Sequence, residues 1–304
     1  MINSILRKKF ILTLNILIKD TKMRKNNLLF RIFVPAMFLS VFFAIIFASL
    51  ALCITYQKDL GNINMRSPLA IFFVLTILIA IVIPVVFAIL LKDLKITRTK
   101  RDLVTSKIAA AFMIIAIGAY EAADIVYLLR TGFDAWRFLR IFLALLFILH
   151  LFFIILPSKT KIAPLIRHCA NAAGPLYTVT SILAIYFWGA AEPIPEYFEI
   201  LFIMSYSLIT LFLLFDFKWR LVPTNPRAYV ALSAMAFVFS CTISVASLWG
   251  VIVRRDIFNN EQIFIAIFEM LLIFTFSIYS LSKTHAIGAT IAHIVKSKKK
   301  ELEK

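Results

Sequence analysis

Residues 32–56 read IFVPAMFLSVFFAIIFASLALCITY without a single charged side chain, and residues 69–91 repeat this character with LAIFFVLTILIAIVIPVVFAILL. A helix needs about 20 mostly apolar residues to cross the hydrocarbon core of a bilayer. Further apolar runs of similar length follow at 107–129, 136–156, 174–191, 197–216, 229–252 and 262–282. The sequence therefore predicts an all-α fold, a polytopic transmembrane helical bundle of about eight spans.

The composition of the whole chain agrees with this prediction. Of 304 residues, 62% are hydrophobic and 16% are charged, whereas soluble domains carry roughly 45–50% apolar residues. The formal net charge of +17 would suggest a nucleic-acid partner in a soluble protein. Here the Lys and Arg residues lie in short segments between apolar runs, and no nucleic-acid-binding motif accompanies them. We therefore expect membrane lipids as partners and no nucleic acid.

The basic residues also predict the orientation of the bundle. The segments before the first span, between spans 2 and 3, 4 and 5, and 6 and 7, and after span 8 contain 8, 6, 3, 3 and 6 Lys and Arg, counting Lys107 at the edge of its span. The other four segments contain 2, 3, 0 and 2, counting Arg137 and Arg140 with Arg130. Because Lys and Arg accumulate in cytoplasmic loops, both termini are expected in the cytoplasm.

This topology divides the chain into three regions. Residues 1–28 form a basic amphipathic segment expected on the inner membrane surface, residues 29–283 hold the eight spans, and residues 284–304 form a basic cytoplasmic tail. A secretory signal peptide is not expected, because Lys19 to Lys25 follow the first apolar stretch without a small-residue cleavage site. In a bacterium, such a chain belongs in the plasma (inner) membrane.

Ionisable residues inside the spans are the first candidates for function, because burying a charge in lipid is costly. Glu121 and Asp124 lie three residues apart and hence on one helix face, with Tyr120 and Tyr127 beside them. A rise of about 1.5 Å per residue places Asp124 about 9 Å and Glu121 about 13 Å below Arg130. Two alternatives follow, a functional site or an ion pair that only locks two helices.

Three residues on other spans extend this candidate site. Arg140 on the adjacent antiparallel span is the expected ion-pair partner of the two acids, and Glu269 in the last span lies about 12 Å below residue 261. His150 lies about 15 Å below Arg140 and reaches the acids only if the helices tilt. It is otherwise a hydrogen-bonded packing residue. Cys53, Cys169 and Cys241 are too far apart in the sequence for a metal motif, so we expect no metal and no cofactor.

Ala123-Asp124-Ile-Val-Tyr-Leu-Leu places an acid before an apolar run, and Phe147-Ile-Leu-His150-Leu-Phe-Phe153 places a histidine on the next span. These two motifs resemble the lysoplasmalogenase-like (YhhN) family of eight-span membrane proteins. The first is similar to the family's span that ends in Gly-Asp or Ala-Asp before an apolar run. The second is similar to its F-x-x-x-H-x-x-Y pattern, with Phe one place closer and Phe153 in place of Tyr. The seventh span departs from the family, because Phe239-Ser240-Cys241-Thr242 carries no acid where F-x-x-S-D is usual.

The resemblance implies hydrolysis of the vinyl ether of a lysophospholipid, lysoplasmalogen, to an aldehyde and a glycerophospho-base. Such chemistry requires an acid that protonates the alkene carbon and a base that activates water. Asp124 would be the leading catalytic residue, with Glu121 and His150 as further catalytic candidates and Tyr120, Tyr127, Arg140 and Glu269 binding the substrate. Either Glu121 or Glu269 replaces the missing acid, or this chain lacks the activity.

A non-enzymatic role is the alternative. The chain would then be a small-molecule or lipid transporter, or a sensory or complex-forming membrane subunit with protein partners or a second copy of itself. Its acids would bind a cation or an amine head group, or would only pair with Arg140. A transporter predicts a polar path across the bundle, and a lipid enzyme predicts an apolar cleft beside Asp124.

Overall fold

The structure is a computed structural model that describes residues 2–57, 62–63, 66–91, 104–132, 134–156, 164–188, 196–221, 226–253 and 263–302. Within these ranges, the side chains of residues 2–24, 56–57, 62–63, 127, 131, 164, 188, 196–198 and 298–302 are not described.

Eight long helices make up nearly all of the described chain. They are α1 (Ile2–Thr55), α2 (Pro68–Leu90), α3 (Val104–Thr131), α4 (Ala135–Ile155), α5 (Pro164–Trp188), α6 (Glu196–Leu221), α7 (Pro226–Val253) and α8 (Ile263–Leu302). Two short strands, β1 (Tyr56–Gln57) and β2 (Asn62–Ile63), pair antiparallel between α1 and α2. The predicted helical bundle is confirmed.

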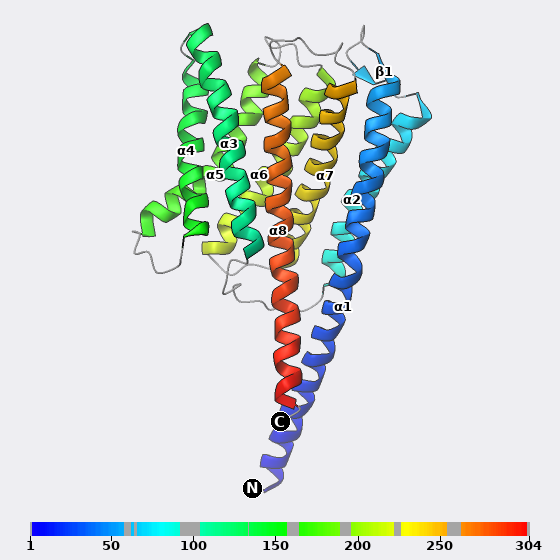
Figure 1. The fold of residues 1–304 in the computed structure, drawn as a ribbon. Coiled ribbons are helices and arrows are strands. Elements are labelled where there is room, and N and C mark those ends of the chain that lie inside the picture. The colour runs from blue at the N-terminus through cyan, green and yellow to red at the C-terminus, as the bar shows by residue number, and fades with distance from the viewer. Residues whose placement is uncertain are drawn as a thin grey trace.

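The helices run up and down in turn, so that both termini lie at the same end of the bundle (Figure 1). At that end α1 and α8 extend well beyond the other helices and lie beside one another (Figure 1). Residues 2–24 continue α1 as one uninterrupted helix. Whether they lie along a membrane surface stays a prediction.

Apolar side chains cover the outside of the bundle, and polar side chains lie within it. In α4 the buried positions recur every three or four residues and include Arg137, Arg140 and His150, whereas Phe142 and Leu145 are more than half exposed. This arrangement is the reverse of a soluble helix, in which the polar face is exposed. It is stable only where lipid contacts the outer surface.

Seven of the eight helices in the described chain are long and apolar enough to cross a membrane, namely all except α5. The chain is therefore an integral, multi-pass membrane protein. Helix α5 is long enough, at 25 residues, but its first half contains Arg167, His168 and Asn171. It begins at Pro164 rather than at the predicted residue 174, because a helix can continue past the point at which the hydropathy falls.

Two groups of helices pack together. Helices α3, α4, α5, α6, α7 and α8 form a closed ring in which each packs on the next and α8 returns to α3. Helices α1 and α2 pack on one another and on α7. Most of α7 is buried, and its many Ser, Ala and Gly residues allow this close approach. The interior of the ring collects the ionisable side chains described below.

Close packing in the centre of the ring depends on one glycine. A Cβ atom at Gly174 in α5 would lie 2.7 Å from Cε2 of Phe147 in α4, well inside van der Waals contact. The Phe147 ring is 1% exposed and stacks on Phe276 of α8 at a centroid distance of 6.0 Å. Any side chain at residue 174 must therefore displace this aromatic layer.

Gly174→Ala is expected to lower the thermal unfolding midpoint of the detergent-solubilised protein, because overpacking a core costs about 1–3 kcal/mol. Gly118→Ala in α3 is the matched control, since no atom lies within 4 Å of its added Cβ and Ala is the better helix former. Phe147→Leu in the Gly174→Ala background should recover part of the loss. Equal effects of the two glycine substitutions would contradict this packing.

Candidate functional site

The candidate site is a buried group of side chains that we call the Arg140 cluster. It consists of Tyr120, Glu121 and Asp124 from α3, Arg137 and Arg140 from α4, Tyr177 from α5, Tyr206 from α6 and Glu269 from α8, each less than 9% exposed. Arg137 is the third residue of α4, so the cluster lies toward the end of the bundle opposite the termini (Figure 1).

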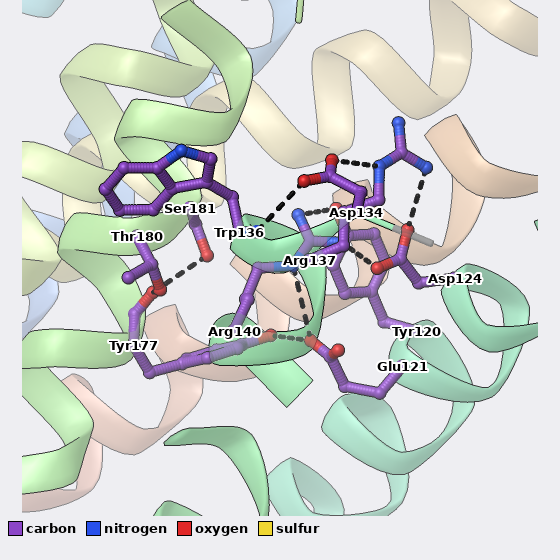
Figure 2. Close-up of polar contacts among 10 residues, drawn as sticks. All are labelled: Tyr120, Glu121, Asp124, Asp134, Trp136, Arg137, Arg140, Tyr177, Thr180 and Ser181. Carbon is purple, nitrogen blue, oxygen red and sulfur yellow. Dashed lines mark hydrogen bonds and ion pairs between the residues drawn. The ribbon is translucent and has the colours of Figure 1, made fainter. Parts of the chain in front are cut away.

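Asp124 binds both arginines. Its Oδ2 lies 2.7 Å from Nη2 of Arg140, and its Oδ1 lies 3.3 Å from Nη1 of Arg137 (Figure 2). Arg137 also lies 3.7 Å from Asp134, whose side chain caps the N-terminus of α4 through the amide of Trp136. The first two turns of α4 therefore hold two guanidinium groups against one face of α3. The predicted pairing of Arg140 with the acids is present.

Glu121 has a different environment. Its Oε1 accepts a hydrogen bond of 2.9 Å from the Tyr177 hydroxyl and lies 3.8 Å from Nε of Arg140, too far for a hydrogen bond. Its Oε2 is buried and accepts no hydrogen bond from the described residues. Because a buried oxygen without a donor is costly, Glu121 is the member of the cluster best placed to receive a further donor.

Tyrosines link the ion pairs to α6 and α8. The Arg140 guanidinium donates a hydrogen bond of 3.2 Å to the Tyr120 hydroxyl and lies 4.9 Å from the centre of the Tyr120 ring. Glu269 interacts electrostatically with both Tyr120 and Tyr206. The Tyr206 hydroxyl is fully buried and makes no hydrogen bond within the described chain. Five helices thus supply polar groups to one place.

The cluster contains more carboxylates than cations. Glu121, Asp124 and Glu269 face two guanidinium groups, and Asp134 at the rim adds a fourth carboxylate. One ion pair is sufficient to hold two helices together. Each further charged side chain raises the free-energy cost of inserting a helix into the membrane, by about 2.5–3.5 kcal/mol at the centre of a span. The excess of acid suits a cation or a hydrogen-bond donor as ligand. Among the described residues, no three His, Cys, Asp or Glu side chains lie close enough together to hold a metal ion.

The structure places the other predicted site residues differently. His150 is buried on α4, but the charged groups that act on it are Asp216, Arg220, Lys283 and Arg167. It is therefore not among the residues that contact the acids, and its catalytic role stays a prediction. The side chain of Tyr127 lies outside the described residues.

Several polar residues of the interior were not among the predicted site residues. Arg137 lies three residues before Arg140 and hence on the same face of α4, and this spacing was the available signal. Asp216 accepts a hydrogen bond of 2.7 Å from Tyr229 and pairs with Arg220 at 3.1 Å. In the sequence, the apolar run of the sixth span ends at Asp216. An acid at the end of an apolar run resembles a loop residue and not a buried one.

Comparison of the chain with protein-family models, with curated proteins and with solved structures finds no match.

Arg140→Gln is expected to destabilise the protein by about 3–5 kcal/mol, because it leaves buried carboxylates without their partner. Arg130→Gln is the matched control, since Arg130 is an exposed arginine in the last turn of the neighbouring helix. Unfolding of both variants in mixed detergent micelles measures the difference. Adding Asp124→Asn to Arg140→Gln should restore part of the stability, and no restoration would contradict the pairing.

Proposed function

We propose that this protein is a membrane transporter that binds a small cationic or amine-bearing solute in the Arg140 cluster. The observation that carries the proposal is the convergence of polar groups from α3, α4, α5, α6 and α8 on one buried place. Binding sites of bundle proteins are built from side chains of facing helices in this way. Ionisable residues within spans usually mark a solute or ion pathway.

Polar groups continue from the Arg140 cluster toward the other end of the ring. Thr210 lies one turn after Tyr206 on α6 and so nearer that end, and it donates a hydrogen bond of 2.7 Å to Thr178 of α5. His150 and the residues around Asp216 follow toward the end that carries the termini. A series of interior polar groups along the ring supports transport over a purely local structural pair. The stacked rings of Phe147 and Phe276 interrupt the series and are suited to act as a gate.

The chemistry of the cluster favours a positively charged solute. Carboxylates outnumber guanidinium groups among its described residues, and tyrosine rings attract cations through their faces. Glu121 Oε2 and the Tyr206 hydroxyl are both without hydrogen bonds to described residues, and an ammonium group supplies up to three donors. The solute would enter from the end of the bundle at which α4 begins.

The proposal includes the full topology, with eight spans and both termini in the cytoplasm. Alkaline phosphatase, which is active only outside the cytoplasm, is expected to be active when fused after Gly132 and inactive after Leu221. Fusion after Trp188 tests α5, whose composition alone does not qualify it as a span. Active phosphatase there means that α5 crosses, and inactive phosphatase would contradict the eight-span arrangement.

A panel of primary and quaternary amines, compared with carboxylates at equal ionic strength, tests the solute class by thermal shift of the purified protein. At least one amine is expected to stabilise the protein, because a ligand at 100 times its Kd contributes about 2.7 kcal/mol. Glu269→Gln should abolish this shift while the variant remains folded. Uptake of the stabilising amine into proteoliposomes then measures transport.

Glu199→Gln is the matched control for this experiment, because Glu199 lies near the start of α6 and is only partly buried. Its thermal shift should equal that of the wild type. Stabilisation by carboxylates instead of amines would contradict the assigned solute class, and stabilisation without uptake would indicate a sensor or receptor.

A lipid hydrolase that resembles lysoplasmalogenase is the second proposal. It is favoured by the two buried acids Glu121 and Asp124 on one face of α3, and weakened by the contacts that both oxygens of Asp124 make with arginines. It predicts aldehyde release from lysoplasmalogen by the wild type and a large loss in Asp124→Asn. No release by the folded wild type would exclude it.

A further inference from the structure

The two buried acids of α3 differ in their contacts with the arginines of α4. Asp124 contacts two guanidinium groups, at 2.7 Å from Nη2 of Arg140 and 3.3 Å from Nη1 of Arg137. Glu121 lies one turn earlier on the same helix face, and its contact with Arg140, at Nε, is 3.8 Å long (Figure 2). Asp124 is therefore the acid whose charge the arginines neutralise directly, and Glu121 needs another source of stability.

The distance between Glu121 and Arg140 indicates which form Glu121 takes. Nε of Arg140 is buried and donates to no described residue, and Oε2 of Glu121 is buried and accepts from none. A carboxylate and a guanidinium N–H that lie close together form a charge-assisted hydrogen bond of about 2.7–2.9 Å. Here Oε1 stays 3.8 Å from Nε and accepts a hydrogen bond of 2.9 Å from the uncharged Tyr177 hydroxyl instead. This geometry is typical of a neutral carboxylic acid.

The burial of Glu121 points to the same form. The residue is 5% exposed, and the Tyr177 hydroxyl supplies the one hydrogen bond that it receives from the described residues. An ionised group without a full set of partners costs far more to bury than its neutral form. A proton on Oε2 replaces an unpaired charge with an unpaired hydroxyl, which costs less.

Charged and titratable groups from five helices surround Glu121. They are Tyr120 and Asp124 on α3, Arg137 and Arg140 on α4, Tyr177 on α5, Tyr206 on α6 and Glu269 on α8. Arg140 is the cation that contacts both acids of α3. Two carboxyl groups that share one site tend to hold a proton between them. Because Asp124 has the shorter contacts with guanidinium groups, the proton belongs on Glu121.

We propose that Glu121 holds a proton while no solute is bound and releases it to water when a cationic solute binds. The inference rests on the proposed transport function and names the proton as the second substrate of the same site. In the exchange, the O–H bond of Glu121 breaks, the proton passes to water, and the carboxylate accepts hydrogen bonds from the ammonium group of the solute. One positive charge enters for each one that leaves, so the net charge of the buried site is unchanged. Such a site couples movement of the solute to movement of a proton in the opposite direction.

Infrared spectroscopy of the purified full-length protein at neutral pH detects this proton without any ligand, because a protonated carboxyl group has a C=O absorption that a carboxylate lacks. The wild type is expected to show the absorption, shifted in heavy water, and Glu121→Gln to lose it. Glu199→Gln is the matched control and should keep it, since Glu199 is a partly buried acid near the start of α6. Absence of the absorption from the folded wild type, or its retention in Glu121→Gln, would overturn the proposal.

Thermal unfolding gives a second readout that needs no ligand. Glu121→Gln keeps the shape and the neutral charge of the protonated acid, and its amide oxygen can accept from Tyr177, so its unfolding midpoint should equal or exceed that of the wild type. Asp124→Asn removes a charge that contacts two arginines and should lower the midpoint. A similar loss in both variants would contradict a neutral Glu121.

Benzyltrimethylammonium is the probe for the exchange itself, because a quaternary amine has no proton of its own to lose. Its binding to the wild type in a lightly buffered solution, followed with a pH-indicator dye, should release about one proton per bound cation. Its affinity should rise by up to about tenfold per pH unit while Glu121 is protonated. Proton release should disappear in Glu121→Gln and match the wild type in Glu199→Gln.

These outcomes separate the exchange from the transport function on which it rests. Binding without proton release, at an affinity that does not depend on pH, would overturn the exchange and leave the cation site in place. A folded wild type that binds neither benzyltrimethylammonium nor any other amine would overturn the proposed function together with the exchange. The infrared absorption then still decides whether Glu121 holds a proton.

Discussion

The arrangement of the ring depends on the ion pair between Arg140 and Asp124, at 2.7 Å between α4 and α3. Lipid solvates neither charge, so each helix must turn its charged face toward the other and away from the bilayer. The apolar faces of both helices then point outward, as the exposed Phe142 and Leu145 do. The same rotation directs Glu121 toward Tyr177 of α5 and brings the remaining helices of the ring around a polar interior.

Two groups of polar side chains lie within the ring, the Arg140 cluster and a second group in which Asp216 interacts with Arg220, Tyr229 and Lys283. The aromatic layer of Phe147 and Phe276 lies between them and is packed tightly enough to require Gly174.

Much of the fold could be predicted from the sequence, because hydropathy reports directly on the contact between helices and lipid. The fourth span was predicted at 136–156 and the helix is Ala135–Ile155. The pairing of Arg140 with Asp124 was also predictable from helical spacing. The interaction of Asp216 with Tyr229 and Lys283 was not, since these residues lie on α6, α7 and α8 and meet only through the packing of those three helices. The charged groups that act on His150 come from other helices, and spacing along one helix gives no information about which neighbours a side chain faces.

The proposed transporter requires water to reach the Arg140 cluster, whereas an ion pair that only holds two helices together would be dry. Cysteine accessibility distinguishes the two, in a background in which Cys53, Cys169 and Cys241 are replaced by alanine. Ser181 lies one turn from Tyr177 on the same face of α5 and is buried, whereas Leu176 on the same helix is 53% exposed toward lipid. A membrane-impermeant cationic thiosulfonate should modify Ser181→Cys and leave Leu176→Cys unmodified. If the reagent does not modify Ser181→Cys in folded protein, water does not reach the Arg140 cluster, and the cluster is only a structural ion pair.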